Sequence, residues 1–149
     1  MNKSLFGSSK IIIYTDGGAR GNPGPAALGV IIGDPSTALR TYREYGEYLG
    51  VKTNNQAEYL AVIFALKKAK QLLGAKKARE AKLEVRMDSE LIVRQMQGKY
   101  KIMEPELKSL FVDVWNLRLD FGKIDFVHVP REQNKRADRI VNKVLDENY

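Results

Sequence analysis

The alternation of apolar and polar residues predicts three strands in the first third of the chain. Short apolar runs rich in β-branched residues, or alternating in character, are typical of strands. We expect strands over residues 11–15, 26–32 and 40–49. The links between them are the Gly/Pro-rich stretch after Asp16 and a turn at residues 33–36. Because both links are short, we expect these strands to pair antiparallel as a meander.

The clearest helix in the pattern covers residues 53–73. Thr53 and Gln56 fit a capping box, and Gly74 is a suitable stop. Residues at helical spacing form a stripe that should pack against the sheet. This stripe consists of Glu58, Ala61, Val62, Ala65 and Ala69. An acid on that face is unusual for a simple core, although an acid near a helix start also favours the helix dipole.

The second half of the chain alternates strands with helices. Residues 75–82 are interpreted as a basic linker or a helix extension with a solvated face. We expect strands at 83–87 and 124–129, helices at 89–97, 104–119 and 135–145, and a loop at 130–134. The core stripe expected for the third helix is Leu107, Leu110, Phe111, Val114 and Trp115. The order β-β-β-α-β-α-α-β-α indicates an α/β fold with a mixed five-stranded sheet and helices on its faces.

Composition predicts one domain over residues 1–149, with residues 1–9 flexible. The apolar content of 44% and the charged content of 29% are ordinary for a soluble protein. No apolar run approaches the length of a membrane span, and the N-terminus lacks a signal-peptide apolar region. Cysteine is absent, which excludes disulfides, and His128 is the single histidine, which excludes zinc. We therefore expect a cytoplasmic protein.

The net charge of +7 points to a polyanionic partner. A plainer interpretation is that the charge keeps the protein soluble, and charge alone does not decide between the two. No helix shows a sustained heptad pattern, so we expect a monomer without a protein partner.

Four acids stand at the ends of strands or the starts of helices. Asp16 ends the first strand, Asp88 follows the fourth, and Glu58 and Asp138 lie near helix starts. Asp16 alone could equally cap its own turn. In helix-covered sheets, ligands bind at strand ends near helix starts. Four converging carboxylates would repel one another unless cations neutralised them.

The donor chemistry of these four acids favours hard divalent cations. Oxygen ligands without Cys or His select Mg²⁺, with Mn²⁺ as a substitute. Two such ions about 4 Å apart can activate a water and stabilise the leaving oxygen of a phosphodiester. The residues thus predict a metal-dependent phosphodiester hydrolase that acts on nucleic acid, without saying which nucleic acid.

Four motifs carry a resemblance to a known family. They are YTDGGARGNPGP at residues 14–25, TNNQAE at 53–58, DS at 88–89 and NKRAD at 134–138. In this order and spacing the chain resembles type 1 ribonuclease H from about residue 10 to about residue 145. The resemblance implies the ribonuclease H fold, with three antiparallel strands plus two parallel ones and helices on both faces. It also implies endonucleolytic hydrolysis of the RNA strand of RNA–DNA hybrids by two divalent ions, leaving 5′-phosphate and 3′-hydroxyl ends.

The resemblance also assigns roles to residues. Asp16, Glu58, Asp88 and Asp138 would be the catalytic, metal-binding carboxylates, and Glu58 would orient water and the 2′-hydroxyl. Residues implied to bind the substrate are Asn22 and Thr53 in a DNA-phosphate pocket, Gly17, Gly18, Ala19, Arg20, Asn54 and Asn55 facing the minor groove, and Ser89 and Asn134. The minor groove is where 2′-hydroxyls mark RNA. Asn54, Asn55 and Asn134 also have a simpler interpretation as helix caps.

The chain departs from the common family pattern in three places. Only residues 98–105 fill the space of the basic protrusion, as in the subgroup found in archaea and some bacteria, so Lys99, Tyr100 and Lys101 are candidates for gripping substrate. Glu90 replaces a glutamine that contacts the minor groove. A mobile histidine precedes the last aspartate in many members. Here His128 falls inside a strand and is interpreted as structural, and Arg131 is the candidate for product release or proton handling.

Two other functions remain open from the sequence. One is a non-catalytic module that binds RNA or hybrids, against which the presence of all four acids argues. The other is a metal nuclease of the same fold that acts on DNA, against which residues 53–55 argue.

Overall fold

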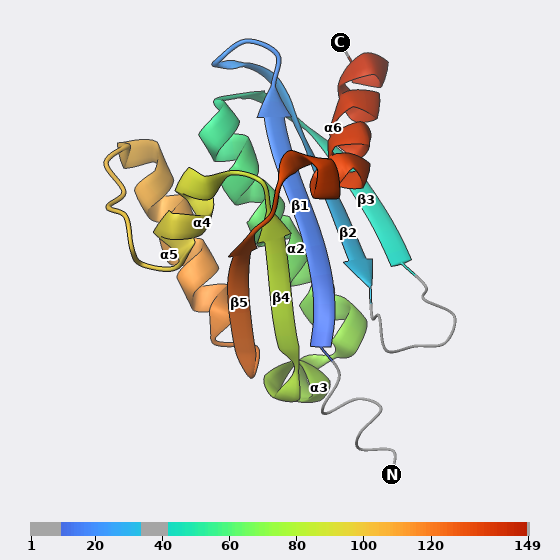
Figure 1. Cartoon of the computed structure of the whole chain (residues 1–149), viewed down its shortest axis with the longest axis vertical. Coiled ribbons are helices and arrows are strands. Elements are labelled where there is room, and N and C mark those ends of the chain that lie inside the picture. Colours follow the sequence, from blue (N-terminus) through green and yellow to red (C-terminus); the bar gives the residue numbers. More distant parts are fainter. Residues whose placement is uncertain (1–9, 34–41, 149) are drawn as a thin grey trace.

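The computed structural model describes residues 10–33 and 42–148, which contain one five-stranded sheet (Figure 1). The strands are β1 (Lys10–Ala19), β2 (Gly24–Gly33), β3 (Tyr42–Lys52), β4 (Lys82–Met87) and β5 (Lys123–His128). Their order across the sheet is β3-β2-β1-β4-β5. The β1–β2 and β2–β3 pairs are antiparallel, and the β1–β4 and β4–β5 pairs are parallel. The predicted mixed sheet is confirmed.

Helices cover both faces of this sheet. They are α2 (Asn54–Leu73), α3 (Ala75–Glu80), α4 (Glu90–Met96), α5 (Pro105–Arg118), the 3₁₀ turn η1 (Arg131–Asn134) and α6 (Lys135–Asn148). The helix α2 packs on β1 and β2 and has α5 beside it, whereas α6 lies over β1, β2 and β3 from the opposite side. None of the helices in the described ranges is both long enough and apolar enough to cross a membrane.

The start and end of α2 follow the sequence pattern. Thr53 Oγ1 accepts from the Gln56 N–H at 3.1 Å, and Gln56 Oε1 accepts from the Thr53 N–H at 2.9 Å. This capping box satisfies two backbone donors at the helix start. At the other end Gly74 takes a φ of 83°, a left-handed conformation that favours glycine. The predicted boundaries of α2 are therefore confirmed to within one residue.

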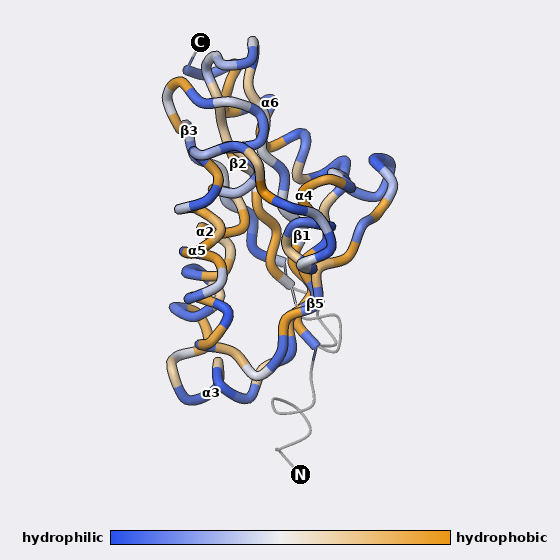
Figure 2. The backbone as a smooth tube through the Cα atoms, turned by 90° about the vertical axis from the view of Figure 1, so that its left-hand side faces the viewer, coloured by the Kyte–Doolittle hydropathy of each residue, from blue (hydrophilic) through white to orange (hydrophobic). Residues whose placement is uncertain are grey.

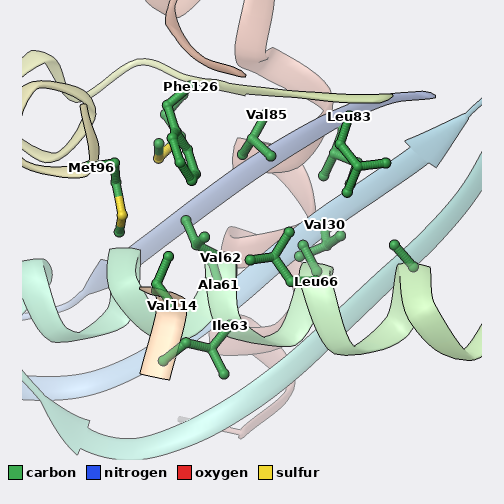
Figure 3. Packing of buried hydrophobic residues seen from close by; sticks show 14 of the residues in the cluster. Val30, Ala61, Val62, Ile63, Leu66, Leu83, Val85, Met96, Val114 and Phe126 are labelled. Atoms are coloured by element: carbon green, nitrogen blue, oxygen red, sulfur yellow. The ribbon is translucent and has the colours of Figure 1, made fainter. Parts of the chain in front are cut away.

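The main core lies between α2 and the sheet. Figure 3 shows Val62 and Leu66 of α2 among Val30, Leu83 and Val85 of the strands. All five side chains are essentially inaccessible to solvent. Their burial holds α2 against the sheet. It therefore determines which residues of β1 the first turn of α2 contacts.

The structure corrects the expected end of the first strand. Asp16 lies inside β1, which continues to Ala19, and the turn to β2 is confined to residues 20–23. The sequence pattern predicts Gly17 and Gly18 in the turn, because glycine is common there. In the structure they are strand residues. Only Gly21 in this turn has a positive φ, of 96°.

Other expectations hold in part. Residues 75–80 form α3, and the expected loop at 130–134 contains η1. Leu107 and Val114 are buried as expected, but Trp115 is 49% exposed and stacks on Phe111, so it was wrongly placed in the core. The expected flexible stretch 1–9, most of the turn at 33–36 and the start of the third strand at 40–41 lie outside the described residues.

Candidate active site

Two of the four predicted acids come together because β1 and β4 are parallel neighbours. Tyr14 of β1 is paired with Arg86 of β4, so Asp16 and Asp88, each two residues further on, lie at the same level. Asp88 directly follows the last residue of β4. Asp16 is 8% exposed although it carries a carboxylate.

The third acid reaches the same point from α2. Glu58 lies in the first turns of this helix and is 8% exposed. One carboxylate oxygen from each of Asp16, Glu58 and Asp88 lies within 4.8 Å of the other two. The sequence prediction that these three carboxylates converge is confirmed.

The helix can approach so closely because β1 has glycine at position 17. A Cβ atom on Gly17 would overlap the backbone of Ala57 and stand 2.5 Å from the Glu58 nitrogen. Such a distance is not sterically possible without a shift of the backbone. The first turns of α2 therefore lie directly against β1, which brings Glu58 to the level of Asp16.

Asp138 completes the acidic group from the other face of the sheet. It lies in the first turn of α6 and lines, with the other three acids, an open cavity of about 370 Å³. Asn142, one turn later, donates from Nδ2 to Asp138 Oδ2 at 3.3 Å. Asn142 also lines the cavity and was missed in the sequence, although its spacing of four residues from Asp138 could have indicated the contact.

Burial and the neighbouring charges raise the pKa values of Asp16 and Glu58. Burial first, then the charges of Asp88 and Asp138 and a hydrogen bond with Asp138, raise the pKa of Asp16 to about 8 from its ordinary value of 3.8. Burial, followed by the charges of Asp16 and Asp88, raises the pKa of Glu58 well above its ordinary value. Both shifts are the response expected of acids that share one site without a neutralising partner.

The residues fit a divalent cation. Glu58 Oε1 is buried and accepts no hydrogen bond from any residue that the structure describes. A buried acceptor without a donor is costly, and a bound cation would satisfy it. The donor set consists of carboxylate oxygens, which hard cations prefer. The geometry thus supports a metal site made from Asp16, Glu58 and Asp88, with Asp138 at its edge.

Asn134 lies beneath this site rather than on its surface. It is 1% exposed, and its Nδ2 donates to the Thr15 carbonyl at 2.9 Å and to Asp88 Oδ2 at 3.5 Å. The sequence predicts a substrate contact or a helix cap at this position. Asn134 Oδ1 accepts no hydrogen bond from any residue that the structure describes, so Asn134 does not cap α6, and its side chain contacts Asp88 instead.

The turn η1 contributes one cationic side chain, Arg131, to the lining of the acidic cavity. Arg131 lines the cavity, and its charge lowers the pKa of Glu58, opposing the larger upward effects. His128 is the last residue of β5, as expected of a strand residue, but it is exposed and does not line the cavity.

Five of the predicted substrate residues line the acidic cavity. Gly17, Gly18, Ala19, Arg20 and Asn54 line the cavity. Asn54 Oδ1 accepts from the Ala19 N–H, and the Asn54 N–H donates to Asn22 Oδ1, both at 2.9 Å. These bonds tie the β1–β2 turn to the start of α2.

Three further predicted substrate residues have partners within the protein. Thr53 caps α2, and Ser89 caps α4 by accepting from the Ile92 N–H at 3.3 Å. Asn55 donates from Nδ2 to Glu104 Oε1 at 2.9 Å. Glu104 precedes α5 and was not singled out in the sequence. None of these contacts involves the acidic cavity directly.

Comparison with known proteins agrees with this arrangement. The family model described as Reverse transcriptase-like matches residues 14–144. The crystal structure of LC11-RNase H1 in complex with an RNA/DNA hybrid is 48% identical, covers 93% of this chain and 98% of that one, and superposes with a TM-score of 0.84. The chain belongs to the type 1 ribonuclease H family.

Other ribonuclease H relatives extend the comparison. Ribonuclease HI of Halobacterium salinarum is 37% identical over 93% of this chain and 65% of that relative, and the crystal structure of an RNase H1 from this archaeon gives a TM-score of 0.83. A bifunctional protein of Mycobacterium tuberculosis is 42% identical over 92% of this chain. The match covers 36% of that relative, so the chain spans about a third of the length of such curated relatives.

Proposed function

We propose that this protein is an endonuclease that hydrolyses the RNA strand of RNA–DNA hybrids, leaving 5′-phosphate and 3′-hydroxyl ends. The observation that carries the proposal is the approach of Asp16, Glu58 and Asp88 to within 4.8 Å in a cavity that Asp138 also lines. A relative of 48% identity crystallised with an RNA/DNA hybrid supports the substrate class.

The proposed cofactor is Mg²⁺, with Mn²⁺ as a substitute and two ions present when substrate is bound. When bound, these ions would activate a water and stabilise the leaving oxygen. Asp16, Glu58, Asp88 and Asp138 would hold them. The raised pKa of Asp16 and the unpartnered Glu58 Oε1 support this assignment, because both defects are removed by a positive charge at that place.

The remaining side chains around the cavity would hold and orient the substrate. Glu58 would orient the attacking water and a 2′-hydroxyl. Asn54, tied to Ala19 and Asn22, would keep the β1–β2 turn in place against the minor groove. Arg131 is the proposed group for product release or proton handling, since it lines the cavity from the side of η1.

Further roles proposed for the substrate residues follow the family pattern. Asn22 and Thr53 would form the DNA-phosphate pocket, and Asn55 would contact the minor groove. Lys99, Tyr100 and Lys101 are exposed in the loop between α4 and α5, where other family members carry the basic protrusion. We also propose that the protein is a monomer. We propose a cytoplasmic location, with which the absence of cysteine agrees.

The proposal is tested by offering purified protein three labelled duplexes of one sequence: RNA–DNA hybrid, duplex DNA and duplex RNA. We expect cleavage of the RNA strand of the hybrid in Mg²⁺, none in excess chelator, and recovery when Mn²⁺ is added. Cleavage of duplex DNA in preference to the hybrid would identify a DNA nuclease of the same fold. Salt-sensitive binding of the hybrid without cleavage in either metal would identify a binding module.

A further inference from the structure

Nearly all of the net positive charge lies in one short stretch, residues 67–82. Lys67, Lys68 and Lys70 belong to α2, and Lys76, Lys77, Arg79 and Lys82 follow Gly74. Against these seven cations stands a single acid, Glu80, so the stretch carries +6 of the chain's +7. The other 133 residues hold 18 basic and 17 acidic side chains, a net +1.

This charge lies at the opposite end of the molecule from the acidic cavity. Glu58 is in the first turns of α2, whereas the basic stretch begins in the last turns and continues through α3. Along α2, at 1.5 Å per residue, Lys67 lies about 14 Å from Glu58. Lys82 lies six residues before Asp88, which is about 20 Å along β4. Figure 1 places α3 at the far end of the sheet from the β1–β2 turn, and Figure 2 shows the hydrophilic character of this end.

Most of the cations of this stretch project into solvent. Lys67, Lys76, Arg79 and Lys82 are exposed, and we call these four residues the basic end surface. Lys67, Lys76 and Lys82 form no ion pair with any residue in the described part of the chain. By contrast, the nearby Lys70 pairs with Asp120 at 3.2 Å.

The sheet adds to this concentration of charge. Lys82 of β4 is in register with Lys10 of β1 on one side and Lys123 of β5 on the other. Like charges directly opposite one another on neighbouring strands are destabilising. Lys10 and Lys123 are compensated by Glu84 and Asp125, at 3.3 and 3.9 Å, but Lys82 has no acidic partner among the residues described. A polyanion bound at this end would relieve the repulsion.

We propose that the basic end surface is a second nucleic-acid-binding site, which contacts the phosphate backbone of the substrate duplex away from the scissile bond. The inference rests on the proposed function for its substrate. Phosphate contacts by Lys and Arg supply affinity without sequence preference. They suit the basic end surface, whose four residues are all lysine or arginine.

The same surface is poorly suited to a lipid bilayer. Helices that bind at a membrane surface insert an apolar face beside their cations. Within residues 67–82 the one large apolar side chain that is exposed is Leu72, at 42%. The apolar face of α2 is buried against the sheet. Charge without an apolar face favours a phosphate backbone as the partner.

The separation of the two sites predicts a dependence on duplex length. A distance of about 14–20 Å corresponds to about four to six base pairs at 3.4 Å per pair. A hybrid of about six base pairs that is cut at its centre extends only about 10 Å to either side of the acidic cavity, which is too short to reach the basic end surface as well. A hybrid of about 30 base pairs can reach both sites.

The test compares kcat and KM on such short and long hybrids in Mg²⁺. The variant Lys67→Gln/Lys76→Gln/Lys82→Gln removes three charges from the basic end surface. The matched control Lys108→Gln/Arg139→Gln/Lys143→Gln removes three exposed charges from α5 and α6. We expect the first variant to raise KM on the long hybrid by about fivefold or more, and to lower the salt slope of binding by about 2 to 3. Its KM on the short hybrid and its kcat should match those of the control.

The outcomes separate this inference from the proposed function. If the unmodified protein cuts both hybrids and the two triple variants have the same ratio of long to short KM, the second site is wrong and the nuclease assignment stands. If the unmodified protein cuts neither hybrid, the nuclease assignment is wrong. The second site is then judged by the salt slope of long-hybrid binding, where equal slopes for the two variants overturn it. Loss of binding to phosphatidylserine vesicles with unchanged hybrid affinity would also overturn it in favour of a membrane contact.

Discussion

Gly17 of β1 lies directly against the backbone of Ala57 in α2, so that no Cβ atom fits between the strand and the helix. Its neighbour Gly18 faces the opposite side of the sheet, where a Cβ atom would meet Val141 Cγ1 at an ordinary 3.6 Å. Two adjacent glycines therefore have different reasons for their small size. Gly17 is required by the approach of α2, and Gly18 is not required by packing.

This difference predicts a contrast between two single substitutions. Gly17→Ala should destabilise the protein by about 1–3 kcal/mol or more, because the added methyl group pushes α2 and Glu58 away from β1. Gly18→Ala should change the free energy of unfolding by much less. Urea unfolding of both variants measures the contrast. Equal stabilities would show that the contact between β1 and α2 is not as tight as described.

The hydrogen bonds of Asn134 predict that it supports Asp88. Asn134→Ala would leave the buried Thr15 carbonyl without its side-chain donor and should cost about 1–3 kcal/mol of unfolding free energy. It should also reduce cleavage, because Asp88 loses a neighbour that fixes its carboxylate. Asn134→Asp, of the same shape, places a further acid beside Asp88 and should reduce cleavage more. Unchanged cleavage rates in both variants would remove this role.

The position of Arg131 predicts a specific effect on Glu58. The Arg131 charge lowers the pKa of Glu58, so Arg131→Ala should raise that pKa further in metal-free protein. Arg131→Lys keeps the positive charge and should raise it less. Carboxyl carbon NMR across a pH titration reads the change directly. A Glu58 pKa that is the same in all three proteins would show that Arg131 does not act on this group.

The raised pKa values predict how metal-free stability depends on pH. The pKa of Asp16 is about 8 in the folded protein and near 3.8 when unfolded, so the folded state binds this proton more tightly. The resulting stabilisation is complete below about pH 4 and is lost as the pH rises through about 8. The pKa of Glu58 is shifted in the same direction. Metal-free protein should therefore unfold more easily near pH 9 than near pH 5.

Two controls accompany this prediction. Added Mg²⁺ should restore stability near pH 9, because a cation bound by the ionised carboxylates stabilises the folded state. Asp16→Asn should flatten the pH dependence, because it removes the group with the raised pKa. Urea unfolding in chelator at both pH values, with and without the substitution, makes the measurement. A stability that rises steadily from pH 5 to pH 9 in chelator would contradict the assigned shifts.

Much of the fold could be predicted because local patterns and tertiary packing agree. The capping box at Thr53, the stop at Gly74 and the strand that leads into Asp88 each depend on neighbouring residues, and each is found as expected. The convergence of Asp16 with Asp88 follows from the parallel register of β1 and β4, although β1 continues three residues beyond Asp16.

The misplaced features depend on long-range contacts. Gly17 was predicted to be a turn residue. Its small size is instead needed for the close approach of Ala57, which is 40 positions away in the sequence. Asn134 was predicted to be a cap or a substrate contact. Its partners, Thr15 and Asp88, are distant in the sequence, so the local pattern does not show these contacts. Trp115 matched the helical stripe, but it lies outside the core and stacks on Phe111 with Arg118 over its ring. Spacing along one helix cannot show where the neighbouring layer ends.

The most direct test of the account is the cleavage of an RNA–DNA hybrid by Asp16→Asn in Mg²⁺, alongside the unmodified protein. The substitution keeps the size of the side chain and removes the carboxylate at the centre of the group formed with Glu58 and Asp88. We expect a folded protein whose rate of RNA cleavage falls by more than about 100-fold, since even loss of a group that only supports a metal ligand costs about 10–100-fold. Cleavage by folded Asp16→Asn at the rate of the unmodified protein would contradict the account.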